Sequence, residues 1–140
     1  MQMRRNRKWM GLAAVLAVLA MRAGACESDE EAVDDGLFRI AVVAPSASND
    51  LAFTQSIVDA VHVLDGVDVI DITDGTFIVA DAAAAVRGYA EDGYDLVIAH
   101  GSQYGGSLQG IAKDFPDAAF AWGTSNDTFG LGNVSAYTAA

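Results

Sequence analysis

The sequence predicts an α/β fold, an open parallel sheet with helices on both faces. Short apolar runs rich in Val and Ile, such as 38–44 and 96–99, are typical of strands buried on both faces. The segments between these runs carry apolar residues at helical spacing. Strands and helices that alternate at this short spacing favour parallel strands joined by crossover helices.

Five strands are expected, at residues 38–44, 67–72, 96–99, 118–122 and 133–137. The first is a continuous apolar run that Pro45 closes, and we expect it to be central in the sheet. The second consists mostly of β-branched residues, which favour extended backbone. Residues 77–80 are compatible with either a short strand or a connecting turn.

Three helices are expected between the strands, at residues 53–64, 81–92 and 107–115. Apolar side chains of the first recur every three or four positions until Gly66 stops the pattern. We expect Asp81 to cap the second helix and Gly93 to end it. Pro116 stops the third helix, because the residue before a proline is disfavoured in helical backbone.

Three loops are expected at the edge where the strands end, the edge at which open parallel sheets bind ligands. These loops are 45–50, 100–106 and 123–132. His100, at the end of a strand, fits either a ligand contact or a hydrogen-bonded structural residue. Gly105 and Gly106 would let the backbone come close to a ligand or make a tight turn.

The sequence gives little support for catalysis, for a metal or for a cofactor. A serine nucleophile elbow has the pattern Gly-x-Ser-x-Gly. Neither Ser102 nor Ser107 has both of the flanking glycines that this pattern needs. No His or Cys cluster has the spacing of metal ligands, and the Gly-Leu-Gly at 130–132 lacks the third glycine of a dinucleotide fingerprint. We therefore expect a protein that is not an enzyme and holds no cofactor or metal.

Residues 1–25 have the organisation of a lipoprotein signal peptide. Four basic residues precede an apolar run of about 13 residues, which is shorter than the roughly 20 that a membrane span needs. Small residues then precede Cys26, the only cysteine, which we expect to be the lipid attachment site. The match to a lipobox is imperfect, since Ala23 stands where Leu is usual and Arg22 interrupts the apolar run. The alternative is ordinary secretion that leaves Cys26 as a free thiol.

Cleavage before Cys26 would remove five of the eight basic residues and none of the nineteen acidic ones, which leaves a net charge of −16. Such a surface repels phosphates and excludes nucleic acid as a partner. We expect residues 26–36 to be an acidic tether and residues 37–140 to be an N-terminal α/β lobe. Residues 136–140 carry no stop signal, so we expect this lobe to be incomplete.

The most specific polar motif, which follows the first strand, is Asn49-Asp50-Leu51-Ala52-Phe53-Thr54-Gln55. The Asn49 amide and the Asp50 carboxylate could bind ligand hydroxyls, while the Phe53 ring could stack on a ligand. In the alternative interpretation, Asn49 or Asp50 caps the helix and Phe53 belongs to the core.

Three stretches resemble the basic membrane protein family, the PnrA-like substrate-binding lipoproteins of ABC transporters. They are Asn49–Gln55, the strand, loop and helix from Gly93 to Asp117, and Phe120–Trp122 followed by Asn133-Val134. The resemblance implies one lobe of a type 1 periplasmic-binding-protein fold, in which two α/β lobes joined by a hinge close over a ligand, often a purine nucleoside.

The resemblance also implies roles for individual residues. Asn49 and Asp50 would bind polar ligand groups and Phe53 would stack on a base. Ser102 and Gln103 would belong to the wall of the ligand site. This chain departs from the family's pattern at Thr54, where Asn is usual, at Ser102, where Phe is common, and at Gly106, where nucleoside binders commonly have Asp. The last two departures bear on whether the solute is a nucleoside.

Together these features predict a solute-binding lipoprotein, anchored by lipid on the extracytoplasmic face of the cell membrane, that delivers a small solute to an ABC permease. One alternative is a ligand-sensing surface lipoprotein of the same fold that has no transport role. The other is a secreted flavodoxin-like enzyme, which detectable turnover or a tightly bound flavin would reveal.

The predicted anchor can be tested by metabolic labelling in a bacterial host that processes lipoproteins. Labelled palmitate should enter the wild-type chain and should not enter Cys26→Ala, because acylation needs the thiol. Equal labelling of the two chains would rule out Cys26 as the lipid attachment site.

Overall fold

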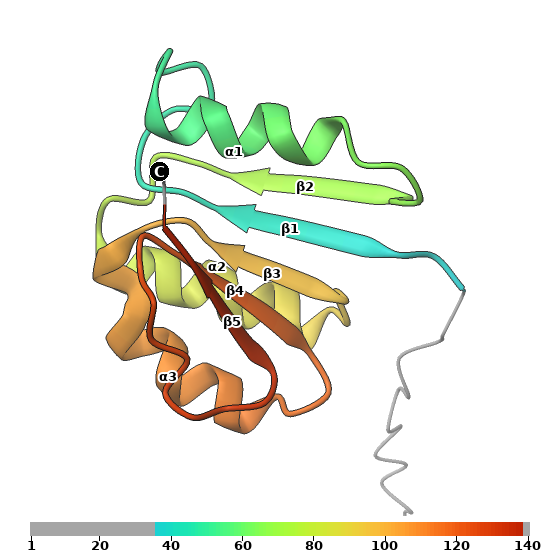
Figure 1. The fold of residues 1–140 in the computed structure, drawn as a ribbon, viewed down its shortest axis with the longest axis vertical. Helices are drawn as coiled ribbons and strands as arrows, with labels where there is room; N and C mark the ends of the chain where they lie inside the picture. The colour runs from blue at the N-terminus through green and yellow to red at the C-terminus, as the bar shows by residue number, and fades with distance from the viewer. Residues whose placement is uncertain (1–35, 139–140) are drawn as a thin grey trace, which may run out of the picture. The chain divides into compact units, whose positions relative to one another are not determined.

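The computed structural model describes residues 36–138, in which five parallel strands form one sheet. The strands are β1 (Arg39–Val43), β2 (Val69–Thr73), β3 (Leu96–Ala99), β4 (Ala119–Gly123) and β5 (Val134–Tyr137). Their order across the sheet is β2-β1-β3-β4-β5 (Figure 1), and every neighbouring pair is parallel. The predicted open parallel sheet is confirmed.

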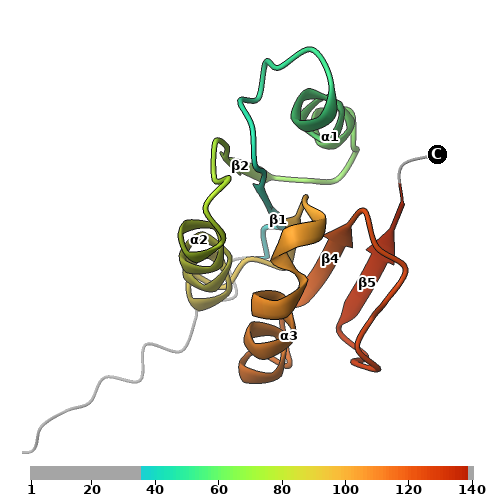
Figure 2. The same ribbon diagram turned by 90° about the vertical axis from the view of Figure 1, so that its left-hand side faces the viewer.

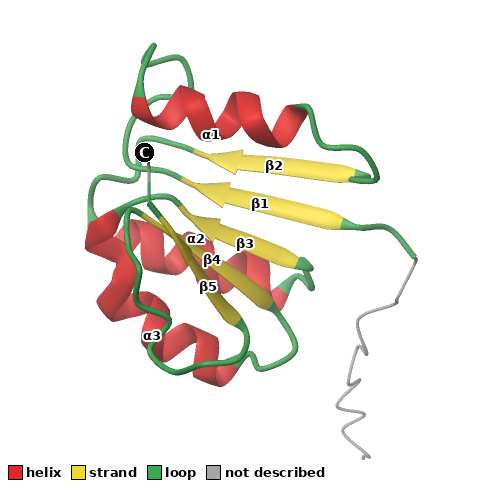
Figure 3. Ribbon diagram, viewed as in Figure 1, coloured by secondary structure: helices red, strands yellow, loops and turns green. Residues whose placement is uncertain are grey.

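The helices lie on both faces of this sheet, as predicted. They are α1 (Phe53–His62), α2 (Val79–Glu91), the short 3₁₀ helix η1 (Ser102–Tyr104) and α3 (Gly105–Asp114). Figure 2 shows α1 on one side of the sheet and α2 with α3 on the other. Figure 3 shows in green the loops that connect helices and strands.

The two faces of β1 supply two separate apolar clusters. Ile40 and Val42 pack with Val61 of α1, and all three are at most 2% exposed. Ala41 and Val43 point to the opposite face, where they join the cluster that α2 and α3 cover. Because successive side chains of a strand point to opposite faces, an apolar run without alternation is what a strand covered on both sides requires.

The predicted central position of β1 needs a small correction. β1 is an inner strand between β2 and β3, but the middle strand of the five is β3. From β1 the chain passes through α1 to β2 at one edge, and it then returns through α2 to β3 on the other side of β1. The strand order therefore reverses at β1, and the loops after β1 and β3 lead to helices on opposite faces.

The start of α2 differs from the prediction. Asp81 does not cap this helix, because the N-cap is Ile78 and the helix begins at Val79. Asp81 lies in the first turn, where its carboxylate is favourable at the positive end of the helix dipole. The segment 77–80, which was compatible with a strand or a turn, contains no strand. Its first two residues belong to the loop and its last two to the helix.

The start of α3 also differs from the prediction. The helix begins at Gly105 rather than Ser107, and η1 precedes it directly. Gly105 is required by a close approach of protein to protein, since a Cβ at this position would lie 2.2 Å from the Trp122 ring. At Gly106 a Cβ would meet no atom within 4 Å. The two glycines therefore have different roles, and neither makes a tight turn.

The predictions for the signal peptide, for Cys26 and for nearly all of the acidic tether concern residues outside the described range of 36–138. Within that range, no helix combines the length and the apolar character that crossing a membrane requires.

The two glycines provide a matched pair of substitutions for a stability test. Gly105→Ala should lower the free energy of unfolding by about 1 to 3 kcal/mol, because the methyl group overlaps the Trp122 ring. Gly106→Ala should raise it by up to about 1 kcal/mol through helix propensity. Urea unfolding followed by circular dichroism measures both, and equal effects of the two substitutions would contradict the packing at Gly105.

Candidate functional site

The loops that follow β1 and β3 start side by side at the carboxyl edge of the sheet. The His100 amide donates to the Val43 carbonyl at 2.8 Å, which continues the pairing of the two strands to their last residues. The loop after β1 is also tied to the end of β2, since the Ser48 amide donates to the Asp74 carboxylate at 2.5 Å.

Asp50 lies two residues before Ala52, the N-cap of α1, and binds the first amides of this helix. Its carboxylate accepts hydrogen bonds from the Ser46 hydroxyl at 2.6 Å and from the backbone amides of Ala52, Thr54 and Gln55 at 2.9 to 3.2 Å. The Ser46 hydroxyl and then the amides hold the pKa of Asp50 far below its usual value, against a smaller opposing effect of burial. Asp50 is therefore not the N-cap residue, but its carboxylate accepts from the amides of the first turn, which is the function predicted for a cap.

These four bonds have a consequence for ligand binding by Asp50. Each carboxylate oxygen accepts two of them, and a carboxylate offers about four lone-pair positions in all. A ligand hydroxyl would have to share or displace one of these donors. Direct contact between Asp50 and a ligand stays a prediction.

Phe53, the first residue of α1, lies against His100. The two ring centroids are 4.0 Å apart and the planes are inclined by 26°. Phe53 is half-buried and is not a member of the two apolar clusters in the described residues. The structure therefore brings Phe53 and His100 together, and Phe53 as a residue is not fully buried.

His100 itself is buried, with 4% of its surface exposed. Its Nδ1 lies 2.6 Å from the Tyr137 hydroxyl at the end of β5, and its Nε2 lies 3.1 Å from the Phe53 carbonyl oxygen. Burial lowers the pKa of His100 more than the Phe53 carbonyl and the Asp50 charge raise it. Of the two interpretations of this histidine, the geometry shows the hydrogen-bonded structural residue.

Aromatic side chains pack against the loop after β3 and hold it by hydrogen bonds. The Trp122 indole NH donates to the Gly101 carbonyl at 3.0 Å, and the indole stacks on Phe129 of the third loop with centroids 4.9 Å apart. The buried Tyr104 hydroxyl donates to the Thr76 carbonyl at 2.8 Å. η1 is therefore anchored on its inner side, which leaves its polar side chains outside.

The three remaining predicted site residues are exposed polar side chains in these loops. Asn49 lies in the loop after β1, and Ser102 and Gln103 lie on η1. Tyr137 and Trp122, which organise the edge, were not predicted from the sequence. A signal was available for Tyr137, because the last residue of a parallel strand lies at the same edge as the ends of its neighbours.

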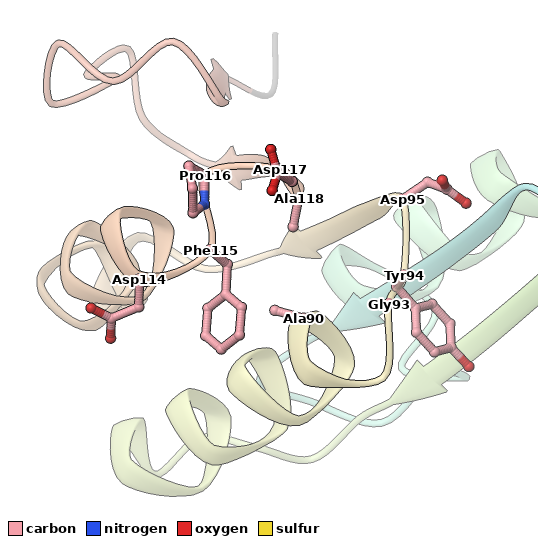
Figure 4. Close-up of a pocket in the computed structure, with 9 residues that line it drawn as sticks. All are labelled: Ala90, Gly93, Tyr94, Asp95, Asp114, Phe115, Pro116, Asp117 and Ala118. Atoms are coloured by element: carbon pink, nitrogen blue, oxygen red, sulfur yellow. The ribbon is translucent and has the colours of Figure 1, made fainter. Parts of the chain in front are cut away.

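A hollow of about 330 Å³ lies at the opposite edge of the sheet (Figure 4). Phe115 lines it, together with the turns that lead into β3 and β4. Two of its carboxylates have partners within the chain: Asp95 accepts from the Arg39 amide, and Asp114 pairs with Arg87 at 2.7 Å. None of the predicted site residues lines this hollow, and among residues 36–138 no group of His, Cys, Asp and Glu could hold a metal ion.

Comparison with known proteins gives a family match and several similar structures. A family model described as "ABC transporter substrate-binding protein PnrA-like" (Bmp) matches residues 37–136. An ABC transporter solute-binding protein from Conexibacter woesei DSM 14684 is 29% identical, with a TM-score of 0.66, and the match covers 72% of this chain and 35% of that one. No curated protein sequence matches.

Two further structures show the same fold at lower identity. An ABC transporter solute-binding protein from Aeropyrum pernix K1 is 20% identical with a TM-score of 0.61, over 72% of this chain and 28% of that one. A protein fragment from Peptoclostridium difficile 630 is 18% identical with a TM-score of 0.60, over 72% of this chain and 84% of that one. The match with the Conexibacter protein thus spans about a third of that chain's length.

The capping role of Asp50 predicts a pH dependence of stability. Because the folded state lowers the pKa of Asp50, its contribution is complete well above pH 3.8 and is lost as the pH falls below that value. Asp50→Asn should therefore be less stable than wild type at pH 7 and should lose less stability between pH 5 and 2. Urea unfolding across this range measures the difference. Asp65→Asn, at an exposed position beyond α1, is the control, and an Asp50→Asn curve parallel to wild type would contradict the prediction.

Proposed function

The chain belongs to the Bmp family of PnrA-like ABC transporter substrate-binding proteins, and from this membership we propose that it binds a small solute outside the cytoplasm for delivery to an ABC permease. In this role the protein makes and breaks no bond. It holds the solute by contacts that can be released, and its specificity depends on the shape and polarity of one site.

The observation that carries the proposal is the contact between Phe53 and His100, which joins the loops after β1 and β3. The strand order reverses between these loops, and open α/β sheets bind ligands at such switch points, beyond the carboxyl ends of the strands. An aromatic ring and several polar side chains are gathered there. This combination suits a small solute with both a flat and a polar part.

A purine nucleoside is the solute class that we propose first. The accessible part of Phe53 would stack on the base, while Asn49, Ser102 and Gln103 would bind hydroxyl groups or ring nitrogens. Asp50 would act chiefly by fixing the loop, since its carboxylate already accepts four hydrogen bonds. Ser102 and Gly106 replace residues that are common in nucleoside binders, so the contacts to a nucleoside would differ at these two positions.

We also propose that a lipid on Cys26 holds the protein at the outer face of the cell membrane. The strongly acidic surface is consistent with this placement, because acidic residues resist non-specific adhesion to anionic lipid headgroups. The acidic residues after Cys26 would act as a hydrophilic spacer between membrane and lobe.

The proposed site can be tested by calorimetric titration of the full-length gene product with adenosine, inosine and guanosine. Phe53→Ala should weaken binding by about tenfold or more, because it removes the stacking surface. Phe38→Ala is the matched control: this phenylalanine is 43% exposed at the opposite edge, and its removal should leave affinity unchanged.

Thermal unfolding of the same proteins separates the site from the core. A large fall in the melting temperature of Phe53→Ala with unchanged affinity would assign Phe53 to the core and contradict the site. If no nucleoside binds, a wider panel of small solutes tests the general proposal. Failure of the whole panel would contradict solute binding.

A further inference from the structure

One buried imidazole links three parts of the chain at the carboxyl edge. His100 follows β3 directly, and both of its ring nitrogens are hydrogen bonded to distant residues. Through Tyr137 the ring reaches the end of β5, and through the Phe53 carbonyl it reaches the first residue of α1. The Phe53 ring also stacks on the imidazole. Two contacts of different kinds thus fix Phe53 relative to the sheet.

The partners determine which ring nitrogen carries the proton. A carbonyl oxygen only accepts, so Nε2 of His100 must donate to Phe53. In a neutral imidazole Nδ1 is then an acceptor, so the Tyr137 hydroxyl must donate to it. Burial lowers the pKa of His100 from 6.5 and raises the pKa of Tyr137 to about 12, so both groups are in the required forms at neutral pH.

Few ionisable groups face the imidazole. Asp50, in the loop before α1, favours the charged ring, but burial opposes it more strongly. β5 contributes Tyr137, β4 contributes Gly123, and η1 contributes no charged residue. A Cβ at Gly123 would lie 3.0 Å from Nδ1 and 2.8 Å from the Tyr137 hydroxyl, so this pair leaves no room for a side chain on β4.

A purely apolar residue would fill the same space without the cost of burying a polar ring. What such a residue could not do is direct the first carbonyl of α1. The Ser56 hydroxyl also donates to this carbonyl, at 2.7 Å, but Ser56 belongs to the same helix and cannot hold that helix against the sheet. Of these two side-chain donors, His100 is the one outside α1, directly after β3.

We infer that His100 is a positioning residue for the solute site: its Nε2–H and its ring hold the start of α1, and with it the Phe53 ring, in the orientation that receives the solute. The inference rests on the proposed function and adds to it a residue that acts through Phe53. Tyr137 serves the same end by donating to Nδ1, which ties the imidazole to the end of β5.

Two substitutions at His100 separate the two nitrogens. The amide nitrogen of a glutamine reaches approximately the place of Nε2, whereas an asparagine reaches only that of Nδ1. His100→Gln should therefore keep the bond to Phe53, and His100→Asn should lose it. Ser56→Ala is the control, because it removes the local donor to the same carbonyl and leaves His100 in place.

Hydrogen exchange gives a readout that needs no ligand. In the full-length gene product, the amides of Thr54 and Gln55 should keep nearly wild-type protection in His100→Gln and Ser56→Ala and should lose it in His100→Asn. In the wild type, protection corrected for the intrinsic rate should fall as the pH drops below 6.5, because burial lowers the pKa of His100 in the folded state and protonation of the ring therefore favours the opened state. This fall should be absent in His100→Gln.

Nitrogen-15 spectroscopy of the imidazole tests the tautomer directly. At pH 7 the wild type should show a neutral His100 with its proton on Nε2. Tyr137→Phe, which removes only the hydroxyl, should keep this tautomer, because the Phe53 carbonyl still requires a donor, and should shift the Nδ1 resonance, because Nδ1 loses its hydrogen bond. A wild-type proton on Nδ1, or an Nδ1 resonance that is unchanged in Tyr137→Phe, would overturn the hydrogen-bond scheme on which the inference depends.

Calorimetric titration with adenosine connects the positioning to binding. Affinity should weaken by about tenfold or more in His100→Asn and by much less in His100→Gln. Equal protection and equal affinity in the two variants would overturn the positioning role. If the wild type binds no nucleoside and the protection pattern holds, the proposed solute class fails, while the positioning of Phe53 by His100 stands.

Discussion

The reversal of strand order between β1 and β3 is the constraint on which the rest of the structure depends. β1 is paired on both sides and covered on both faces. The chain that leaves β1 passes through α1 on one face of the sheet, and the chain that leaves β3 passes through α3 on the other (Figure 2). The two loops therefore diverge from adjacent starting points. Side chains from distant parts of the sequence meet between them, as Phe53 and His100 do.

Hydrogen bonds within the chain set the shape of this edge before any solute arrives. Carboxylates are used as acceptors for backbone amides, at Asp50 for the start of α1 and at Asp74 for Ser48. The loop after β3 is held by side-chain donors instead. The Trp122 indole donates to the Gly101 carbonyl, and the Tyr104 hydroxyl donates to the Thr76 carbonyl. A site whose groups are already fixed loses less conformational entropy on binding, which favours affinity. The proposed function thus relies on the rigidity of loops that have little regular structure.

Much of the fold could be predicted from the sequence, because apolar runs and helical spacing report burial directly. The runs in β1 and β3 and the glycine and proline stops after the helices placed most elements within a few residues. The starts of α2 and α3 could not be predicted. At Gly105 the Trp122 ring on β4 leaves no room for a side chain, and this contact joins residues that are distant in the sequence.

The same limit applies to the site. The motif around Asp50 and Phe53 was identified because its residue types lie together in the sequence and resemble a family pattern. That Asp50 has its acceptor positions filled by its own loop, and that Phe53 lies on His100, depends on backbone geometry that no pattern reports. The position of Tyr137 at this edge follows from the end of a predicted strand, but its pairing with His100, 37 residues away, does not.

The most direct test of the central claim is hydrogen–deuterium exchange of the full-length gene product, with and without a solute that calorimetry has shown to bind. The account predicts that the solute slows exchange in the loops at 45–55 and 100–106, at the carboxyl edge of the sheet. Slower exchange at 90–95 and 114–118 instead, around the hollow at the opposite edge, would contradict it.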